Sequence, residues 1–194
     1  MSDVDALVLA ASQRGDHAAA AELVVRTYMR EVVAYLASIT RASERVDEAF
    51  SVWCEDVVRG IAGFRFASSI RTWAYTVARH AASRCAREDH RRTKRISPGD
   101  AFDEIAAVAR TETADYLRTA MKDRLAAVRA ELVEEERELL HLRVDRQLPW
   151  RDIEEIVRPE GPDDAAARKR REQALRKRFE MLKRRLKARM SDVE

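Results

Sequence analysis

Apolar residues recur at every third or fourth position along most of the chain, the spacing that places side chains on one face of an α-helix. The clearest stripe in the first forty residues consists of Leu23, Val24, Tyr28, Val32, Tyr35, Leu36 and Ile39. Ser2 or Asp3 is the expected N-cap of a preceding helix, and Gly15-Asp16 is expected to end that helix and cap the next. A third helix is predicted from about 44 to 60, with an apolar side formed by Phe50, Trp53, Cys54, Val57 and Val58.

The segment "FRFASS" (64–69) interrupts this pattern and follows Gly60 and Gly63, so we predict a short loop. A fourth helix is expected to begin at Ser69, with an apolar stripe of Ile70, Ala74, Val77, Ala78, Ala81 and Cys85. The residues expected on its opposite, solvated face are Thr72, Thr76, Arg79, His80, Ser83 and Arg87. Trp73 lies at the boundary of the two faces, where packing is the favoured interpretation.

A break follows at "HRRTKRISPGDAF", where Pro98-Gly99 ends a dense run of charge. We therefore expect two helical domains, residues 1–96 and 119–194, joined by a linker at 97–118. In the second domain, helical periodicity is given by Leu125, Val128, Leu132, Leu139, Leu140 and Leu142. "VDRQLPW" is predicted to be a turn, and Pro149 is placed at the opening of a short helix, where its missing N–H costs little.

The last helix is predicted to be unusually long. Pro159 and Pro162 in "RPEGPDD" forbid a continuous helix, and Asp163 or Asp164 is the natural N-cap of the next one. From Ala165 to about Met190 nothing breaks the pattern, which predicts one rod of roughly 25 residues, near 38 Å at the standard rise. Its apolar stripe consists of Leu175, Phe179, Leu182 and Leu186.

Composition and charge narrow the function. Gly (5) and Pro (4) are scarce among 194 residues, which favours an all-α fold. Seven basic residues and two acidic ones lie in 79–95, and twelve basic residues and two glutamates lie in 168–189, with five glutamates and one arginine in 131–138 between them. Two basic segments separated by an acidic one suggest two contacts with a polyanion.

The same sequence offers little for other kinds of site. Cys54 and Cys85 stand alone among apolar residues, as buried reduced thiols do, and the four histidines lack metal-ligand spacing. No nucleophile–base pair or Gly-rich phosphate loop is present, so we expect no enzyme, no cofactor and no metal. Without a signal peptide or a run of 18–20 apolar residues, a cytoplasmic protein with no membrane partner is expected.

Four segments in order resemble the extracytoplasmic-function (ECF) sigma factors of bacteria. Gly15-Asp16 with its alanine-rich helix resembles the start of that family's first domain, and "SSIRTWAYTVARHAASR" (68–84) is similar to its Ser-x-Arg-Thr-Trp-Leu-Tyr-x-Ile-Ala-Arg-Asn pattern, with His80 in place of Asn. "ELVEEERELLHLRVDRQLPWRDIEEI" (131–156) resembles the opening of its second domain, the first part of a helix-turn-helix. "ALRKRFEMLKRRLKAR" (174–189) resembles the closing basic helix.

The resemblance implies a promoter-specificity subunit that binds core RNA polymerase and promoter DNA. The first domain would open the minus-ten element, holding its backbone with basic side chains and receiving bases in a pocket at the 64–69 loop. The residues expected to bind the minus-ten element are Phe66, Ser68, Ser69, Arg71, Arg79, His80, Arg84 and Arg87. The second domain would place its extended final helix in the major groove of the minus-thirty-five element.

The final helix is longer than the family's, which would begin near Ala174. Its N-terminal extension carries Arg168, Arg170 and Arg171, and these either read the minus-thirty-five element or leave the contacts to Arg176, Lys177 and Arg178. We favour the extension. The remaining alternative for the whole chain is a two-domain helix-turn-helix regulator that acts on duplex DNA without polymerase.

The polymerase-binding helix departs from the family. Where ECF proteins usually have Asp-Ala-Glu-Asp and then Leu-Val-Gln-Glu, this chain has Arg45-Val46-Asp47-Glu48 and then Ala49-Phe50-Ser51-Val52. The matching contact residues are Asp47, Glu48, Ser51 and Val52. Phosphorylation of Ser43 or Ser51 by a regulatory kinase would restore negative charge, although an interface that has simply drifted is the preferred interpretation. Many family members are also held by an anti-sigma factor.

Overall fold

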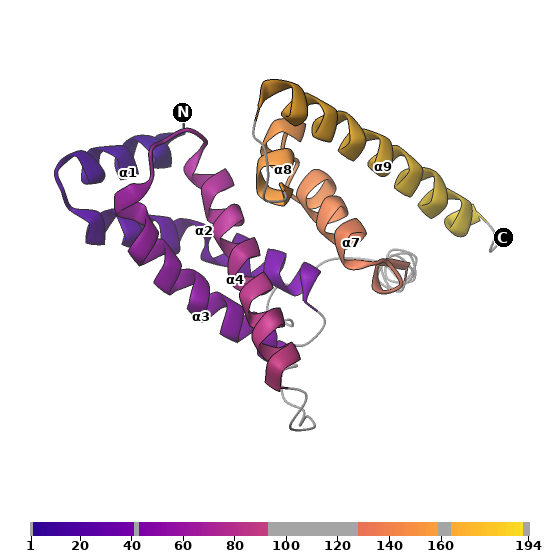
Figure 1. Cartoon of the computed structure of the whole chain (residues 1–194), viewed down its shortest axis with the longest axis horizontal. Coiled ribbons are helices and arrows are strands. Elements are labelled where there is room, and N and C mark those ends of the chain that lie inside the picture. Colours follow the sequence, from indigo (N-terminus) through magenta and orange to yellow (C-terminus); the bar gives the residue numbers. More distant parts are fainter. Residues whose placement is uncertain (1, 41–42, 93–127, 159–163, 192–194) are drawn as a thin grey trace, which may run out of the picture.

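The computed structural model describes residues 2–40, 43–92, 128–158 and 164–191. Within these ranges every regular element is helical, which confirms the all-α prediction. The elements are α1 (Asp3–Gln13), α2 (His17–Ile39), α3 (Ser43–Gly60), the 3₁₀ turn η1 (Ile61–Gly63), α4 (Ile70–Arg92), α7 (Glu134–Leu140), the π-helical turn η2 (His141–Asp145), α8 (Trp150–Val157) and α9 (Ala165–Ser191). Figure 1 shows α1–α4 gathered on one side of the molecule and α7–α9 on the other.

The helix starts that the sequence predicts are built as expected. Ser2 and Asp5 form a reciprocal capping box at the start of α1, with Ser2 Oγ accepting from the Asp5 amide at 3.2 Å and Asp5 Oδ2 accepting from the Ser2 amide at 2.8 Å. Gly15 adopts φ +75°, which few residues other than glycine tolerate, and Asp16 then caps α2 by accepting from the Ala19 amide at 3.0 Å.

The core of the first half lies between α2, α3 and α4. Trp53 is fully buried, and its indole Nε1 donates to the Ala74 carbonyl oxygen of α4 at 3.0 Å, so the ring joins α3 to α4 without an unpaired donor. Most of the predicted α2 and α4 stripes are buried. The prediction for Val58 is wrong: it lies on the outer side of α3 and is 60% exposed, while Trp53 and Val57 fill the inner side.

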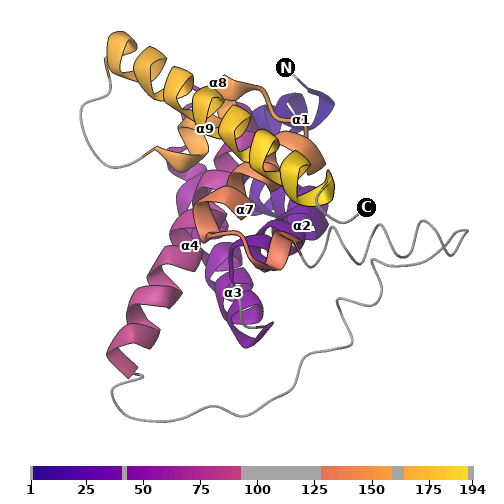
Figure 2. The ribbon, with the colours of Figure 1, turned by 90° about the vertical axis from the view of Figure 1, so that its right-hand side faces the viewer.

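In the second half, α9 lies along α7 and α8 (Figure 2). Pro149 caps α8, and Asp164 caps α9 by accepting from the Ala167 amide at 2.7 Å. From Ala165 to Ser191 the helix is unbroken over 27 residues, which confirms the rod. Phe179 and Leu182 hold α9 in place, with the Phe179 ring edge-on to Trp150 at 5.5 Å.

The two halves touch each other. α4 contacts α8, and α2 contacts α7 and η2, so the buried apolar residues form one continuous cluster. The predicted linker, 97–118, lies outside the described residues, as does the start of the predicted second domain.

Candidate nucleic-acid interface

An aromatic cluster borders the loop at residues 64–69. The sequence predicted a loop here, and the structure confirms that these residues are not helical. The Phe64 ring lies 4.7 Å from Phe66 and 5.1 Å from Trp73, and all three side chains are half-buried. Phe66 has a φ of +55°, a conformation that is uncommon for a bulky residue. Trp73 also packs closely on Gly60, where an added Cβ would lie 3.2 Å from the indole. Trp73 therefore supports the loop by packing, as predicted.

The end of this loop is fixed by Ser69, its own last residue, and by Asp5 from α1. Ser69 Oγ accepts from the Thr72 amide at 3.0 Å and shares a 2.8 Å hydrogen bond with Thr72 Oγ1, so Ser69 serves as the N-cap of α4. Asp5 Oδ1, from α1, accepts from the Ile70 amide at 2.9 Å. Burial acts to raise the pKa of Asp5, but the backbone donors of Ser2 and Ile70 outweigh it and the pKa is lowered. The carboxylate thus joins α1 to the first turn of α4.

The polar face predicted for α4 is partly wrong. Thr72 is fully buried, because its hydroxyl is satisfied inside the cap with Ser69 and needs no water. Arg79 is also not a solvated side chain: it is only 29% exposed and its Nε lies 3.0 Å from Glu138 of α7. His80, Ser83 and Arg87 are exposed, as predicted.

Two further α4 arginines are held by carboxylates of the first half. Arg71 Nε donates to Glu31 of α2 at 2.9 Å, and its Nη2 reaches the Arg146 carbonyl oxygen at 3.5 Å. Arg84 forms an ion pair with Asp56 of α3. Ser68 is half-buried within the loop. Among the predicted minus-ten residues, His80 and Arg87 are therefore the most accessible side chains.

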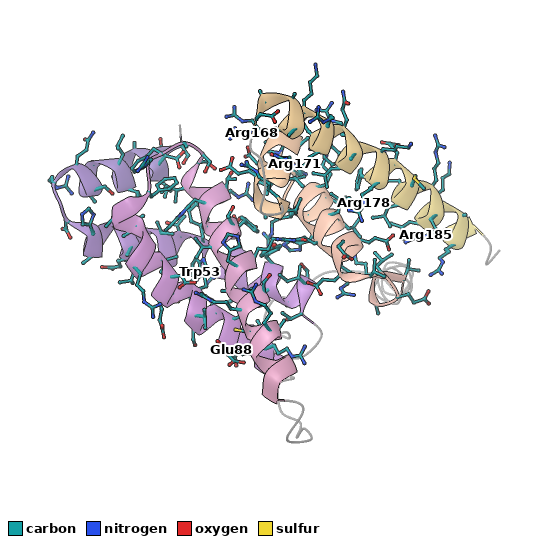
Figure 3. The ribbon with its side chains drawn as sticks, in the orientation of Figure 1. Trp53, Glu88, Arg168, Arg171, Arg178 and Arg185 are labelled. Carbon is teal, nitrogen blue, oxygen red and sulfur yellow. The ribbon has the colours of Figure 1, made fainter. Side chains whose placement is uncertain are left out.

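The predicted polymerase contacts lie on the outer side of α3. Asp47 and Ser51 are exposed, and Glu48 and Val52 are half-buried, while Ala49 and Trp53 face the core. Asp47 and Ser51 are thus accessible on this helix, whereas Val52 packs partly against the core. Trp53 and the side chains around it are drawn in Figure 3.

The basic side chains of α9 differ in how firmly they are held. Arg168, Arg170, Lys177 and Arg178 are exposed on α9. Figure 3 labels Arg168 and Arg178 along this helix. Arg171 is half-buried, and its Nε donates at 2.6 Å to Glu154 of α8, a carboxylate that is itself 3% exposed. Arg176 is paired with Glu172 one turn earlier. Arg171 therefore connects α9 to α8, whereas its neighbours face solvent.

Sequence reasoning missed a polar contact between the halves. Glu138 of α7 is 5% exposed, and its Oε1 accepts from Tyr35 Oη at 2.5 Å and from Arg79 Nε at 3.0 Å. Burial raises the pKa of Glu138, with Arg79 and the Tyr35 hydroxyl opposing the rise, and burial together with Glu138 raises the pKa of Tyr35 well above its usual value. A signal was available: Glu138 stands four residues before the buried Leu142, on the same helical face.

His141 lies beside this contact, with its ring centroid 5.9 Å from that of Tyr35. Nε2 accepts from Arg146 Nε at 3.3 Å, so the ring proton is placed on Nδ1, 3.3 Å from Asp145. Burial lowers the pKa of His141 to about 4, and the nearby positive charges of Arg146 and Arg129 add to the effect while Asp145 opposes it. The imidazole is neutral at physiological pH.

Among the described residues, no group of three or more His, Cys, Asp and Glu side chains is arranged to hold a metal ion. None of the helices within the described ranges is long and apolar enough to cross a membrane. Cys85 is buried and Cys54 half-buried, and neither forms a disulfide. The candidate interface therefore consists of cationic, aromatic and hydrogen-bonding side chains.

Comparisons with known proteins agree with this arrangement. The family model for sigma-70 region 2 matches residues 24–95, which include most of α2 and all of α3 and α4. The RNA polymerase sigma factor YlaC of Bacillus subtilis (strain 168) is 28% identical over 143 residues, which cover 73% of this chain and 81% of the relative. No solved structure matches the chain significantly. The two matches together support the resemblance of the chain to the extracytoplasmic-function sigma factors of the sigma-70 family.

Proposed function

We propose that this sigma factor directs core RNA polymerase to promoters by contacting a minus-ten element with its first half and a minus-thirty-five element with its second. The observation that carries the proposal is the region 2 match over residues 24–95, because it covers the helices that hold the aromatic loop and the basic side chains of α4. The polymerase performs the chemistry, so the chain itself needs no catalytic group. Because this protein would act with the polymerase on chromosomal DNA, we place it in the cytoplasm.

At the minus-ten element, the 64–69 loop and the solvent-facing side of α4 would have different roles, one toward the bases and one toward the backbone. Phe66 and Ser68 lie in the loop, where an unstacked base would be received against the aromatic cluster. His80 and Arg87, exposed on α4, are placed to hold the backbone of the opened strand. Ser69 acts through the cap that fixes the loop, since its hydroxyl is already used by Thr72. Arg71, Arg79 and Arg84 reach DNA only by exchanging a carboxylate for a phosphate.

At the minus-thirty-five element, we favour the N-terminal extension of α9 as the segment that contacts the bases. It would act within a helix-turn-helix formed by α8 and α9. Recognition helices contact bases through their N-terminal part, and Arg168 and Arg170 are exposed there. Arg171 is placed to orient the helix through Glu154 rather than to read bases. Lys177 and Arg178, two to three turns further along, remain the alternative contacts, with Arg176 paired to Glu172 beside them.

The polymerase contact is proposed for Asp47, Glu48, Ser51 and Val52 on the outer side of α3. Ser51 is exposed there, so it is accessible to a kinase if added charge is needed for affinity. An anti-sigma factor that covers this surface would inhibit the chain. If the unmodified protein binds core polymerase tightly, phosphorylation by a kinase is not needed for this contact.

A capture experiment with core polymerase tests the function. Tagged full-length protein is incubated with purified core enzyme, and the complex is then given a premelted promoter template. We expect association and a defined transcript start. The matched variants are Glu48→Lys on the proposed contact and Asp3→Lys on exposed α1, which change charge equally; only Glu48→Lys should lose the polymerase. Specific binding to duplex DNA with no polymerase association would instead favour a regulator that acts alone.

A further inference from the structure

A cavity of about 560 Å³ lies between the end of α2, the start of α3, the second half of α4 and the start of α7. This volume is within the range of pockets that bind small organic molecules, roughly 300–1,000 Å³. The promoter and polymerase contacts proposed above do not require an enclosed space of this size. The chemistry of the lining therefore indicates what kind of small molecule the cavity could hold.

The lining carries more positive than negative charge. Its charged members are four arginines and two glutamates: Arg45, Arg79, Arg87, Arg137, Glu134 and Glu138. Arg79 and Glu138 form an ion pair at 3.0 Å and so neutralise each other. The other three arginines face a single further glutamate across the cavity lining. An excess of positive charge in a concave site favours an anionic ligand.

One of these cations, Arg137, is held in place by uncharged groups. It donates to three backbone carbonyl oxygens, those of Leu132 at 2.6 Å, Ser38 at 2.9 Å and Ile39 at 3.5 Å. These bonds fix the guanidinium without neutralising its charge, and they use three of its five N–H donors. A guanidinium that is already oriented loses little freedom when it binds, and its fork of donors matches the oxygens of a phosphate.

The second half of α4 adds polar groups that are open to solvent. Arg87 and Ser83 both line the cavity and both are exposed. Because they are four residues apart, their side chains lie on the same face of the helix. The Ser83 hydroxyl can donate or accept a hydrogen bond. These two side chains are therefore placed to contact one group of a ligand together.

The remaining wall of the cavity is apolar. Ile39, Ala82 and Cys85 line it and are buried, whereas Val133 lines it with 55% of its surface exposed. An exposed valine beside arginines matches a ligand that has an apolar body as well as a charged group. An inorganic phosphate ion would use only the cationic part of the lining and would leave most of the volume unfilled.

We propose that this cavity is a binding site for a small organic phosphate of about nucleotide size. Arg87 and Arg137 bind its phosphate groups, and Val133 and the small apolar side chains of α4 contact its organic body. The site is independent of the proposed function, because the chain alone supplies all of its lining. Binding can therefore be measured without polymerase or promoter DNA.

Isothermal titration calorimetry on the full-length chain tests the ligand class with three probes: ADP, inorganic phosphate and adenosine. We expect ADP to bind more tightly than inorganic phosphate, and adenosine, which has no phosphate, to bind least. Methyl NMR then locates the bound ADP. The signals of Ile39, which lines the cavity, should shift, whereas those of the equally buried Ile156 of α8 should not.

Charge reversal at the cavity tests the binding residues. Arg87→Glu should weaken ADP binding at least about tenfold, because it replaces a phosphate donor with a carboxylate. Arg65→Glu is the matched control: Arg65 is exposed in the 64–69 loop, outside the lining, and the same change there should leave the affinity unaltered. Ser83→Glu is a second variant, which places a carboxylate one turn from Arg87, and Ser83→Gln is its uncharged control.

Three results would overturn the assignment. ADP could fail to bind, inorganic phosphate could bind as tightly as ADP, or both Arg87→Glu and Ser83→Glu could bind ADP as the unmodified protein does. NMR shifts confined to α9 would likewise place the anion on the exposed arginines of that helix and not in the cavity. Circular dichroism checks that each variant is folded. Failure of the proposed function would appear separately, as a chain that does not associate with core polymerase.

Discussion

Replacing Asp5 with alanine tests how α1 controls the aromatic loop. Asp5 is 6% exposed, and its two carboxylate oxygens accept from the Ile70 amide at 2.9 Å and the Ser2 amide at 2.8 Å. A hydrogen bond to a charged group contributes about 1.5–3 kcal/mol, and the Ser2 amide is a less buried partner than the Ile70 amide, so its bond counts for less. We therefore expect Asp5→Ala to lower the free energy of unfolding by about 3 kcal/mol.

The measurement is urea unfolding followed by circular dichroism, with hydrogen exchange at the Ile70 amide as a local readout. Asp3→Ala is the control, since Asp3 is an exposed acid in the same first turn and should cost less than about 1 kcal/mol. Asp5→Asn retains one neutral acceptor and should fall between the two. The role of Asp5 at the start of α4 is refuted if Asp5→Ala is no more destabilising than Asp3→Ala and leaves the Ile70 amide protected.

The stabilisation lost in Asp5→Ala should also depend on pH. The pKa of Asp5 is lowered in the folded chain, so its ionised form stabilises the fold above the ordinary aspartate pKa of about 3.9, and this stabilisation is lost as the pH falls through the folded value. The difference between the unmodified protein and Asp5→Ala should be constant near neutrality and shrink in acid. A difference that grows in acid would contradict the assignment.

Three other predictions concern the surface of α4, the junction and α9. Arg87→Ala should weaken promoter binding in the holoenzyme and reduce the slope of log K against log salt by about 1, and an unchanged slope would remove Arg87 from the interface. Because the pKa of His141 is lowered to about 4, the free energy of unfolding should fall by on the order of 3 kcal/mol as the pH drops from about 6.5 to 4. Urea unfolding of His141→Asn should lack this loss, and a variant that retains it would assign the pH dependence to another group. Joint replacement of Arg168 and Arg170 by alanine should abolish the minus-thirty-five footprint without changing stability, and an unaltered footprint would give that role to later residues of α9.

Local rules explain why the helices were predictable. The α1–α2 boundary needs only Gly15 and Asp16, and the start of α9 needs only a carboxylate after two prolines, so both follow from neighbours in sequence. The long stripe of α9 was predictable for the same reason, since Phe179 and Leu182 recur at helical spacing. The region 2 resemblance also rested on a contiguous segment.

The junction was not predictable, because its partners lie far apart in sequence. The position of Glu138 on the helical face of Leu142 indicates burial but does not identify its partners, because Tyr35 and Arg79 are 103 and 59 positions away. Thr72 was misassigned for a related reason: its polarity suggested exposure, but Ser69 satisfies the hydroxyl within the cap. Burial of a polar side chain depends on whether a partner is present, which periodicity does not report.

Promoter selection measures whether this chain gives core polymerase its promoter specificity. Core polymerase, with and without the full-length chain, transcribes a library of random-sequence templates, and the transcript starts are sequenced. We predict defined starts only with the chain, preceded by two enriched sequence blocks separated by a constant spacing. Starts identical to those of core polymerase alone, with no enriched block, would show that the chain does not supply promoter specificity.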